Sequence, residues 1–192
     1  MRMKFSFDLP SWMAQALKRC TQIFPRVEDR MRWVVSLARE NVERETGGPF
    51  GAAVFDAEGR VVAAGVNVVV KEHCSMLHAE MVAIVLAQRE LGRYDMSDGG
   101  KADYELVSSS EPCAMCFGAL PWSGITRLVC AARAEDASAI GFDEGPKPRN
   151  WQKALETRGI RVVRDVLRQE AVDVLALYAK TGGIVYSPNL RK

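Results

Sequence analysis

His78-Ala79-Glu80 and, further along the chain, Pro112-Cys113-Ala114-Met115-Cys116 are the two stretches that decide the fold. Together they offer one imidazole and two thiols as metal ligands, and a carboxylate. A zinc site that performs chemistry has three protein ligands and leaves its fourth tetrahedral position to water. The two stretches therefore predict a zinc site that activates water, with the Glu80 carboxylate beside it.

The spacing within each stretch supports this assignment of roles. Cys113 and Cys116 are three residues apart and share one face of a helix. At the start of a helix the positive end of the dipole lowers a thiol pKa and favours the thiolate that zinc requires. His78 and Glu80 are two residues apart and do not share a helix face, so we expect Glu80 to act on the water or the substrate rather than on the metal.

Two other interpretations of the same residues remain open. The first is that Cys113 and Cys116 are ordinary core thiols. The second is a structural zinc whose fourth ligand is His73, Cys74 or Cys130. Glu80 has no purpose in either interpretation.

Composition limits the class of protein. The chain has 192 residues, 48% of them hydrophobic, and a formal net charge of +2. This predicts one globular domain over 1–192, with an extension over about 1–25 and a tail over about 182–192. A protein that grips a long phosphate backbone is usually more basic, so we expect a small-molecule substrate and no nucleic-acid partner.

The cysteine count and the N-terminal sequence bear on the compartment. Five cysteines, an odd number that includes one tight pair, argue against a disulfide framework and suit a reducing cytoplasm. Asp8 and Pro10 interrupt the apolar stretch that a signal peptide needs. No apolar run approaches the roughly 18 residues of a membrane span, so we expect a cytoplasmic protein with no membrane partner.

Hydrophobic periodicity predicts an alternating order of helices and strands. Helices are expected over 10–20, 27–44, 78–91, 112–120 and 167–180, and strands over 51–55, 61–70, 104–108, 126–131 and 160–163. A loop rich in glycine and proline covers 141–150. This order predicts an α/β fold, a three-layer α/β/α sandwich with a mixed five-stranded sheet. Both halves of the zinc signature fall where strand ends meet helix starts, where sites in such sheets lie.

Several further stretches carry a resemblance to a known family. They are Gly48-Pro49-Phe50-Gly51-Ala52, Asn67, Trp122 and Gly141-Phe142-Asp143-Glu144, besides the zinc signature extended to Glu111. From about Gly48 to the last helix the chain resembles the cytidine/deoxycytidylate deaminase superfamily, whose zinc-dependent members share this signature. The Pro-Phe-Gly-Ala and Gly-Phe-Asp-Glu stretches are similar to those of guanine deaminases, and the implied fold is cytidine-deaminase-like.

The resemblance implies a zinc-dependent aminohydrolase that converts guanine to xanthine and ammonia in purine catabolism. One Zn²⁺ per subunit would be held by His78, Cys113 and Cys116, while Glu80 moves protons and Glu144 assists at the substrate's amino side. Residues expected to contact the substrate are Phe50, Asn67, Ala79, Trp122 and Tyr186. The resemblance also implies a homodimer in which a C-terminal segment carrying Tyr186 caps a site; in this family the segment can cross over to the partner's site.

Physical logic at Glu144 favours guanine independently. Guanine presents N1–H and an amino group side by side, and a carboxylate satisfies both donors, whereas adenine offers a lone pair at N1. A buried polar group left unpaired costs roughly 1–3 kcal/mol. Glu144 stands where relatives often have aspartate, and Ser110 where a cysteine often precedes Glu-Pro-Cys. Because ammeline copies the same edge of guanine, amino-s-triazines are expected as weaker substrates.

Three alternative functions stay open at this point. A tRNA adenosine deaminase shares the zinc core but needs a basic surface, for which the candidates are Arg158, Arg161, Arg164 and Arg168. A cytosine or dCMP deaminase is the second alternative. The third is a non-enzymatic interaction module in which zinc is only structural.

Overall fold

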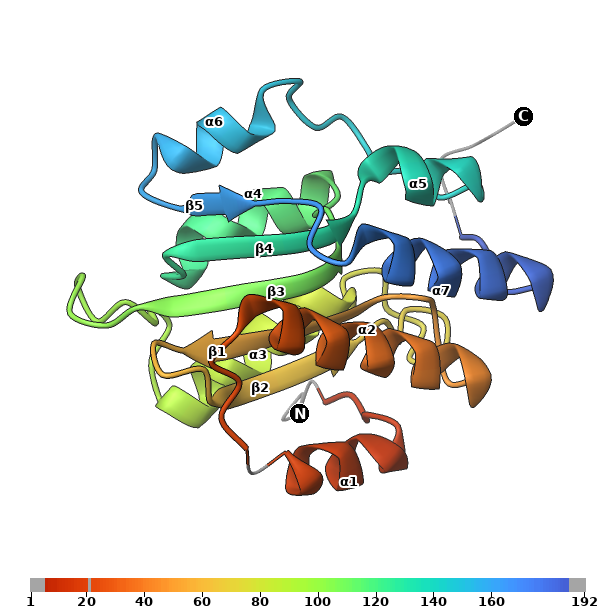
Figure 1. Cartoon of the computed structure of the whole chain (residues 1–192), viewed down its shortest axis with the longest axis horizontal. Coiled ribbons are helices and arrows are strands. Elements are labelled where there is room, and N and C mark those ends of the chain that lie inside the picture. Colours follow the sequence, from red (N-terminus) through yellow and green to blue (C-terminus); the bar gives the residue numbers. More distant parts are fainter. Residues whose placement is uncertain (1–5, 21, 187–192) are drawn as a thin grey trace, which may run out of the picture.

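A computed structural model describes residues 6–20 and 22–186 and shows a mixed five-stranded sheet in the order β2-β1-β3-β4-β5 (Figure 1). The strands are β1 Gly51–Asp56, β2 Val61–Val66, β3 Tyr104–Ser110, β4 Arg127–Ala132 and β5 Arg161–Val163. β1 pairs antiparallel with both β2 and β3, whereas β3, β4 and β5 run parallel. The predicted mixed five-stranded sheet is confirmed.

Helices cover both faces of this sheet (Figure 1). They are α1 Ser11–Arg19, α2 Val27–Glu43, α3 Ala79–Leu91, α4 Ala114–Ser123, α5 Ala134–Ala139, α6 Trp151–Glu156 and α7 Arg168–Lys180. Alternate residues of each strand point to opposite faces, so that Val107 and Val129 pack with α2 and α7, while Leu106 and Leu128 pack with the α3, α4 and α6 side. The three-layer sandwich is confirmed.

The arrangement of β3 and β4 sets the place of the site. The two strands are parallel, with Ser110 opposite Ala132 at their carboxyl ends. The chain leaves β3 at Ser110 and enters α4 within a few residues, and α3 begins at the same edge after the loop that follows β2. Ligand sites in open parallel sheets form at this edge.

Several boundaries differ from the sequence-based expectation. The strand expected over 61–70 ends at Val66, because the chain turns after Asn67. Val68 and Val69 are buried, but they belong to the loop that follows the strand. Pro112 precedes α4 instead of opening it, since Cys113 is the N-cap and the helix runs on to Ser123. The six-residue helices α5 and α6 were not predicted, because they are too short to show a helical repeat.

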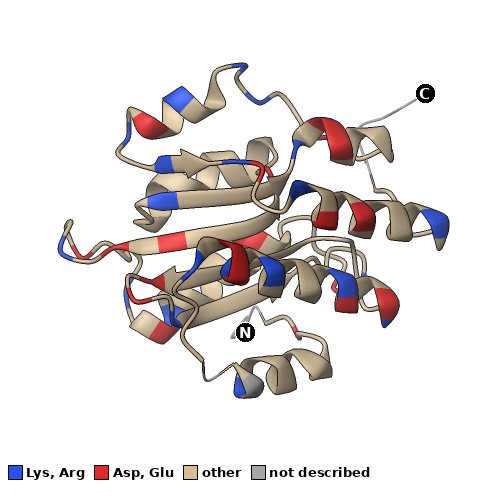
Figure 2. Ribbon diagram, viewed as in Figure 1, with Lys and Arg blue, Asp and Glu red and all other residues tan. Residues whose placement is uncertain are grey.

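Charged residues of both signs are interspersed over α2 and α7 (Figure 2). Two members of the candidate basic stripe are engaged internally, since Arg164 pairs with Glu111 and Arg168 with Asp136. The charges of these two arginines are thus balanced by carboxylates of the same chain. Separately, none of the helices in the described part of the chain has the length and apolarity needed to cross a bilayer.

Candidate metal centre and active site

The three predicted metal ligands meet at the start of two helices. His78 is the N-cap of α3 and Cys113 the N-cap of α4, with Cys116 in the first turn of α4. The Nδ1 atom of His78 lies 3.5 Å from Cys113 Sγ and 3.7 Å from Cys116 Sγ. All three donor atoms lie within 4.8 Å of one another, a spacing that suits a single ion bound between them.

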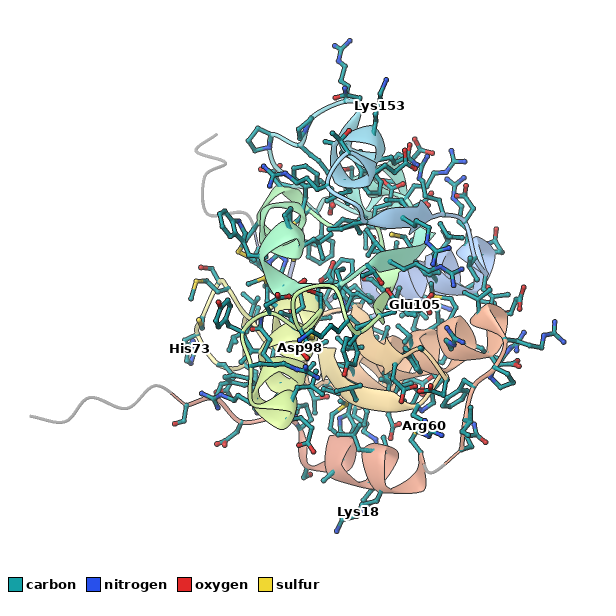
Figure 3. All side chains as sticks on the ribbon, turned by 90° about the vertical axis from the view of Figure 1, so that its left-hand side faces the viewer. Lys18, Arg60, His73, Asp98, Glu105 and Lys153 are labelled. Carbon is teal, nitrogen blue, oxygen red and sulfur yellow. The ribbon has the colours of Figure 1, made fainter. Side chains whose placement is uncertain are left out.

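The donor set of this site fits zinc with one position left open. One imidazole nitrogen and two thiolates match the ligands of catalytic zinc sites in deaminases. Within residues 6–20 and 22–186 the group of potential ligands holds only these three side chains. His73 lies at the periphery (Figure 3), and neither Cys74 nor Cys130 belongs to the group. No fourth ligand among the described residues therefore closes the site as a structural zinc would require.

The electrostatics of the ligands favour binding of a cation. A hydrogen bond from Cys116 lowers the pKa of Cys113 to about 4, whereas the pKa of Cys116, which supplies that hydrogen, is well above its usual value. Burial lowers the pKa of His78, but the hydrogen bond and charge of Cys113 outweigh it, and the net shift is upward. The surroundings of Cys113 therefore favour its thiolate form, which a bound cation would require.

Glu80 occupies the first turn of α3, beside the ligands but outside their group. Its side chain is buried, and burial, followed by the charge of Cys113, raises its pKa. A carboxyl group with a raised pKa can accept a proton and later release it, which is the requirement for a group that acts as base and then as acid. Glycine at position 65 allows α3 to approach, because a Cβ atom there would lie 2.6 Å from the carbonyl oxygen of Ala79.

A small pocket opens next to the metal ligands. It has a volume of about 40 Å³. Its lining consists of Phe50, Asn67, His78, Glu80, Ser110, Glu111, Cys113, Phe142, Asp143, Glu144 and Tyr186. The residues come from loops and termini far apart in the sequence, so the fold brings together most of the predicted site.

Asn67 is the first residue of the loop after β2, and hydrogen bonds hold its backbone in place. Its backbone carbonyl accepts hydrogen bonds from the Gly48 amide and from the side chain of Asn41. A Cβ atom at Gly47 would lie 2.0 Å from that carbonyl oxygen, which explains the glycine there. The amide nitrogen of the Asn67 side chain remains directed into the pocket, where it donates to the Tyr186 hydroxyl at 2.7 Å.

Aromatic rings close the remaining side of the pocket. Phe50 and Phe142 meet edge to face with centroids 5.0 Å apart, and Tyr186 packs against Phe142 at 5.8 Å. The Tyr186 hydroxyl lies 3.4 Å from His78 Nε2. In the single chain, Tyr186 thus covers the pocket of its own subunit, while residues 187–192 of the expected cap lie outside the described residues.

Glu144 lies on the loop between α5 and α6, which packs against the start of α4. The amide of Ala114 donates to the Glu144 carbonyl at 2.8 Å. Burial is the main cause that raises the pKa of the Glu144 carboxyl to about 8, with the charge of Cys113 adding to it and that of Lys147 opposing it. Among the described residues, the buried Oε2 atom of Glu144 has no hydrogen-bond partner, so it is left to a bound molecule.

Two of the expected substrate contacts lie elsewhere. Trp122 is 78% exposed at the end of α4 and does not line the pocket. Ala79, the first residue of α3, is fully buried against β2 and does not line the pocket. Trp122 does not form a wall of this pocket in the single chain, because α4 ends with that side chain directed to solvent.

Sequence reasoning did not assign a site role to Ser110, Phe142 or Asp143, which line the pocket. The hydroxyl of Ser110 is buried without a hydrogen-bond partner. Its place two residues after the strand expected over 104–108, next to Glu-Pro-Cys, could have indicated this role. Phe142 and Asp143 could have been predicted to line the pocket because they directly precede Glu144.

Comparisons with known proteins agree with this geometry. Residues 25–132 match the family described as the cytidine and deoxycytidylate deaminase zinc-binding region. A guanine deaminase of Bacillus subtilis (strain 168) is 36% identical over 69% of this chain and 81% of its own length.

Solved structures extend the match to nearly the whole chain. A guanine deaminase from Nitrosomonas europaea superposes with a TM-score of 0.88 at 45% identity, covering 94% of this chain and 98% of that one. A complex with 2,6-diaminopurine superposes with a TM-score of 0.87 at 46% identity, over 95% and 96% of the two chains. The chain therefore belongs to the cytidine and deoxycytidylate deaminase family of zinc-binding enzymes.

Proposed function

We propose that this enzyme hydrolyses guanine to xanthine and ammonia, a step of purine catabolism. The observation that carries the proposal is the pairing, in one pocket, of the Asn67 amide with the unpartnered carboxylate oxygen of Glu144, beside Glu80 and the three metal ligands. Asn67 offers a donor to the acceptor atoms of a purine, and Glu144, in its ionised form, offers an acceptor to N1–H and the amino group. The similarity to guanine deaminases of two organisms supports the same substrate.

The mechanism follows from the positions of the side chains. His78, Cys113 and Cys116 would hold zinc, which when bound lowers the pKa of a coordinated water toward about 7. Glu80 accepts one proton of the water whose oxygen attacks the carbon that carries the amino group, and passes it to the adjacent ring nitrogen. The second proton of that oxygen goes to the amino group, so that the C–N bond breaks, ammonia leaves and the oxygen becomes the new carbonyl. Glu144 holds the amino side of the base and assists the departure of ammonia. Phe50 and Phe142 enclose the ring and keep bulk water away.

Entry of the substrate requires Tyr186 to move. A cavity of about 40 Å³ holds water molecules but no purine base. Because the Tyr186 hydroxyl accepts the hydrogen bond that Asn67 would donate to the base, the substrate and Tyr186 compete for one donor. Once the base is bound, Tyr186 can close over it, in the same subunit or in a partner.

A panel of bases tests the substrate assignment. The purified, zinc-loaded protein is incubated with guanine, guanosine, adenine, adenosine, cytosine and cytidine, and ammonia release is measured. We expect release from guanine and none from cytosine or adenosine. Turnover only with adenosine in tRNA, or only with cytosine, would replace the proposal by one of those two activities, and zinc binding without any turnover would favour a structural metal.

Ammeline is a second expected substrate on grounds of shape. Its amino group, ring nitrogen and carbonyl repeat the edge of guanine that Asn67 and Glu144 would bind. We expect ammonia release that is weaker than from guanine, because ammeline lacks the imidazole ring that Phe50 and Phe142 would enclose. No ammonia from ammeline, at concentrations at which guanine is consumed, would contradict this prediction.

The outer face of α4 supports a homodimer. The sequence of α4 is apolar on all sides, and helices of this kind are normally buried, yet only Cys116, Leu120 and Ser123 are buried in the single chain. The face ends in the exposed Trp122. In the proposed homodimer, a second copy of the chain covers this face of α4. This contact also accounts for the exposed aromatic side chain of Trp122.

Trp122→Glu tests the dimer. Placing a charge within an apolar interface is expected to convert the dimer to a monomer at micromolar concentration, as measured by light scattering after size-exclusion chromatography. Tyr94→Glu, which changes another exposed aromatic residue outside α4, is the matched control. A wild-type monomer, or a variant that remains dimeric, would exclude α4 as the interface.

A further inference from the structure

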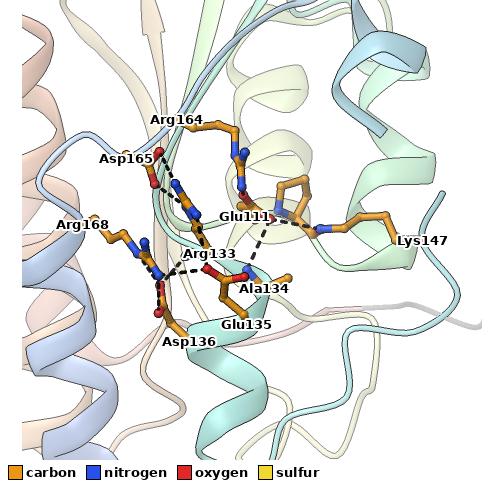
Figure 4. A network of polar contacts seen from close by, with 10 residues as sticks. Glu111, Arg133, Ala134, Glu135, Asp136, Lys147, Arg164, Asp165 and Arg168 are labelled. Atoms are coloured by element: carbon orange, nitrogen blue, oxygen red, sulfur yellow. Dashed lines mark hydrogen bonds and ion pairs between the residues drawn. The ribbon is translucent and has the colours of Figure 1, made fainter. Parts of the chain in front are cut away.

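A buried cation on the loop that carries Glu144 has no part in the mechanism above. This cation is Lys147, whose side chain is only 9% exposed. Its Nζ atom donates to the carbonyl oxygen of Pro112 at 2.9 Å and lies 3.5 Å from Glu111 Oε2 (Figure 4). It also lies 4.6 Å from the centre of the Trp151 ring. Lys147 therefore joins the loop to the segment that leads into Cys113.

The charge of Glu111 does not by itself explain this lysine. Glu111 is buried with 4% of its side chain exposed, and Arg164 already contacts Oε1 of its carboxylate through two nitrogens (Figure 4). The other oxygen, Oε2, also accepts from the amide of Ala134 at 3.3 Å. Burying a second cation carries a further desolvation penalty, so its position points to a role beyond neutralising Glu111.

Contacts of the backbone show what Lys147 holds in place. The loop touches the start of α4 through the hydrogen bond from the Ala114 amide to the Glu144 carbonyl. It also approaches at Gly145, which has a φ of +68° and whose Cβ would lie 3.0 Å from Ala114 Cβ. Three contacts within four residues, at Glu144, Gly145 and Lys147, thus fix a loop that has no regular secondary structure of its own.

We propose that Lys147 is a positioning residue that clamps the Glu144 loop to the Glu111-Pro112-Cys113 turn and so sets the place of the Glu144 carboxylate beside the metal ligands. The inference rests on the proposed function, in which Glu144 binds the substrate. Supporting residues of this kind typically alter activity by about 10- to 100-fold when they are removed. The clamp is testable independently of turnover, because it restrains the amides of residues 141–150.

The test compares Lys147→Met, which keeps the side-chain stem and removes the ammonium, with Lys147→Arg and with Lys153→Met. Lys153 projects from α6 at the periphery and is exposed (Figure 3), so it receives the same chemical change outside the clamp. Zinc content, melting temperature, the kcat and KM for guanine, and deuterium exchange over 141–150 are measured for each. If Lys147→Met does not fold, Lys147→Gln takes its place, since its amide can still donate a hydrogen bond.

For Lys147→Met we expect full zinc content, faster exchange over 141–150 and a fall in kcat/KM of roughly 10- to 100-fold. Lys147→Arg should recover most of the activity, and Lys153→Met should match the wild type. Because Lys147 acts through Glu144, adding Lys147→Met to Glu144→Gln should cause little further loss.

Three results would overturn the clamp: faster exchange with wild-type kinetics, slower turnover with unchanged exchange, or no change in either. A wild-type protein that leaves guanine untouched would refute the proposed function instead. In that case the exchange measurement alone decides whether Lys147 restrains the loop.

Discussion

Replacing Glu80 with glutamine is expected to remove nearly all turnover of guanine while zinc and the fold are retained. Glutamine has the size of glutamate but cannot accept a proton from water or return one to the ring nitrogen. General acid–base groups contribute roughly 100- to 10,000-fold to rate, and Glu80 serves in both directions, so we expect a loss toward the upper end. The effect should appear in kcat, measured as xanthine formed per mole of zinc.

The matched control for this variant is Glu90→Gln. Glu90 is an exposed acid near the end of the same helix, α3, so it tests for indirect effects on that helix. Metal analysis and circular dichroism check that Glu80→Gln is loaded and folded. Wild-type turnover by zinc-loaded Glu80→Gln would show that Glu80 carries no proton, and would revive the interpretation of the zinc as structural.

The second large effect is expected on stability. It concerns a buried ion pair near the amino end of β3, whose carboxyl end contributes Ser110 to the pocket. Glu105 of β3 receives a hydrogen bond from Arg30 of α2 at 2.9 Å, and Arg127 lies 2.8 Å from its other oxygen. Glu105 and Arg30 are both buried. Glu105→Leu leaves the Arg30 charge uncompensated, which typically costs about 3–5 kcal/mol, or roughly 6–20 °C in melting temperature for a chain of this size.

A double variant separates the lost pairing from a general packing defect. Arg30→Met combined with Glu105→Leu replaces the buried pair by apolar side chains and is expected to recover much of the stability. Thermal unfolding followed by calorimetry gives both values. An unchanged melting temperature in Glu105→Leu, or a double variant less stable than both single ones, would contradict the account of this pair.

The parts of the fold with long periodic patterns were predictable from the sequence. The amphipathic repeat predicts α2 to within one residue of its observed end, and the glycine after Leu91 marks the end of α3. The metal ligands were predictable because their chemistry needs particular residue types at particular spacings. Val68 and Val69 misled the strand boundary, because a loop that packs on the core is as apolar as a strand.

The remainder depends on contacts that no local pattern records. Lys147 reaches Pro112 and Glu111 across a long stretch of sequence, and nothing near position 147 indicates a buried cation. The exposure of Trp122 likewise depends on what covers α4, which a single chain does not contain. Sequence patterns predict which residues perform the chemistry, whereas the residues that hold them in place emerge only from the three-dimensional fold.

The most direct test of the central claim is the stoichiometry of guanine hydrolysis as a function of bound zinc. Xanthine and ammonia are measured for the zinc-loaded protein, for protein stripped with a chelator, and for stripped protein with zinc restored. The account predicts equal amounts of xanthine and ammonia with zinc, none after stripping, and recovery on restoration. Xanthine formation that persists without metal, or a fully zinc-loaded protein that leaves guanine unchanged, would contradict it.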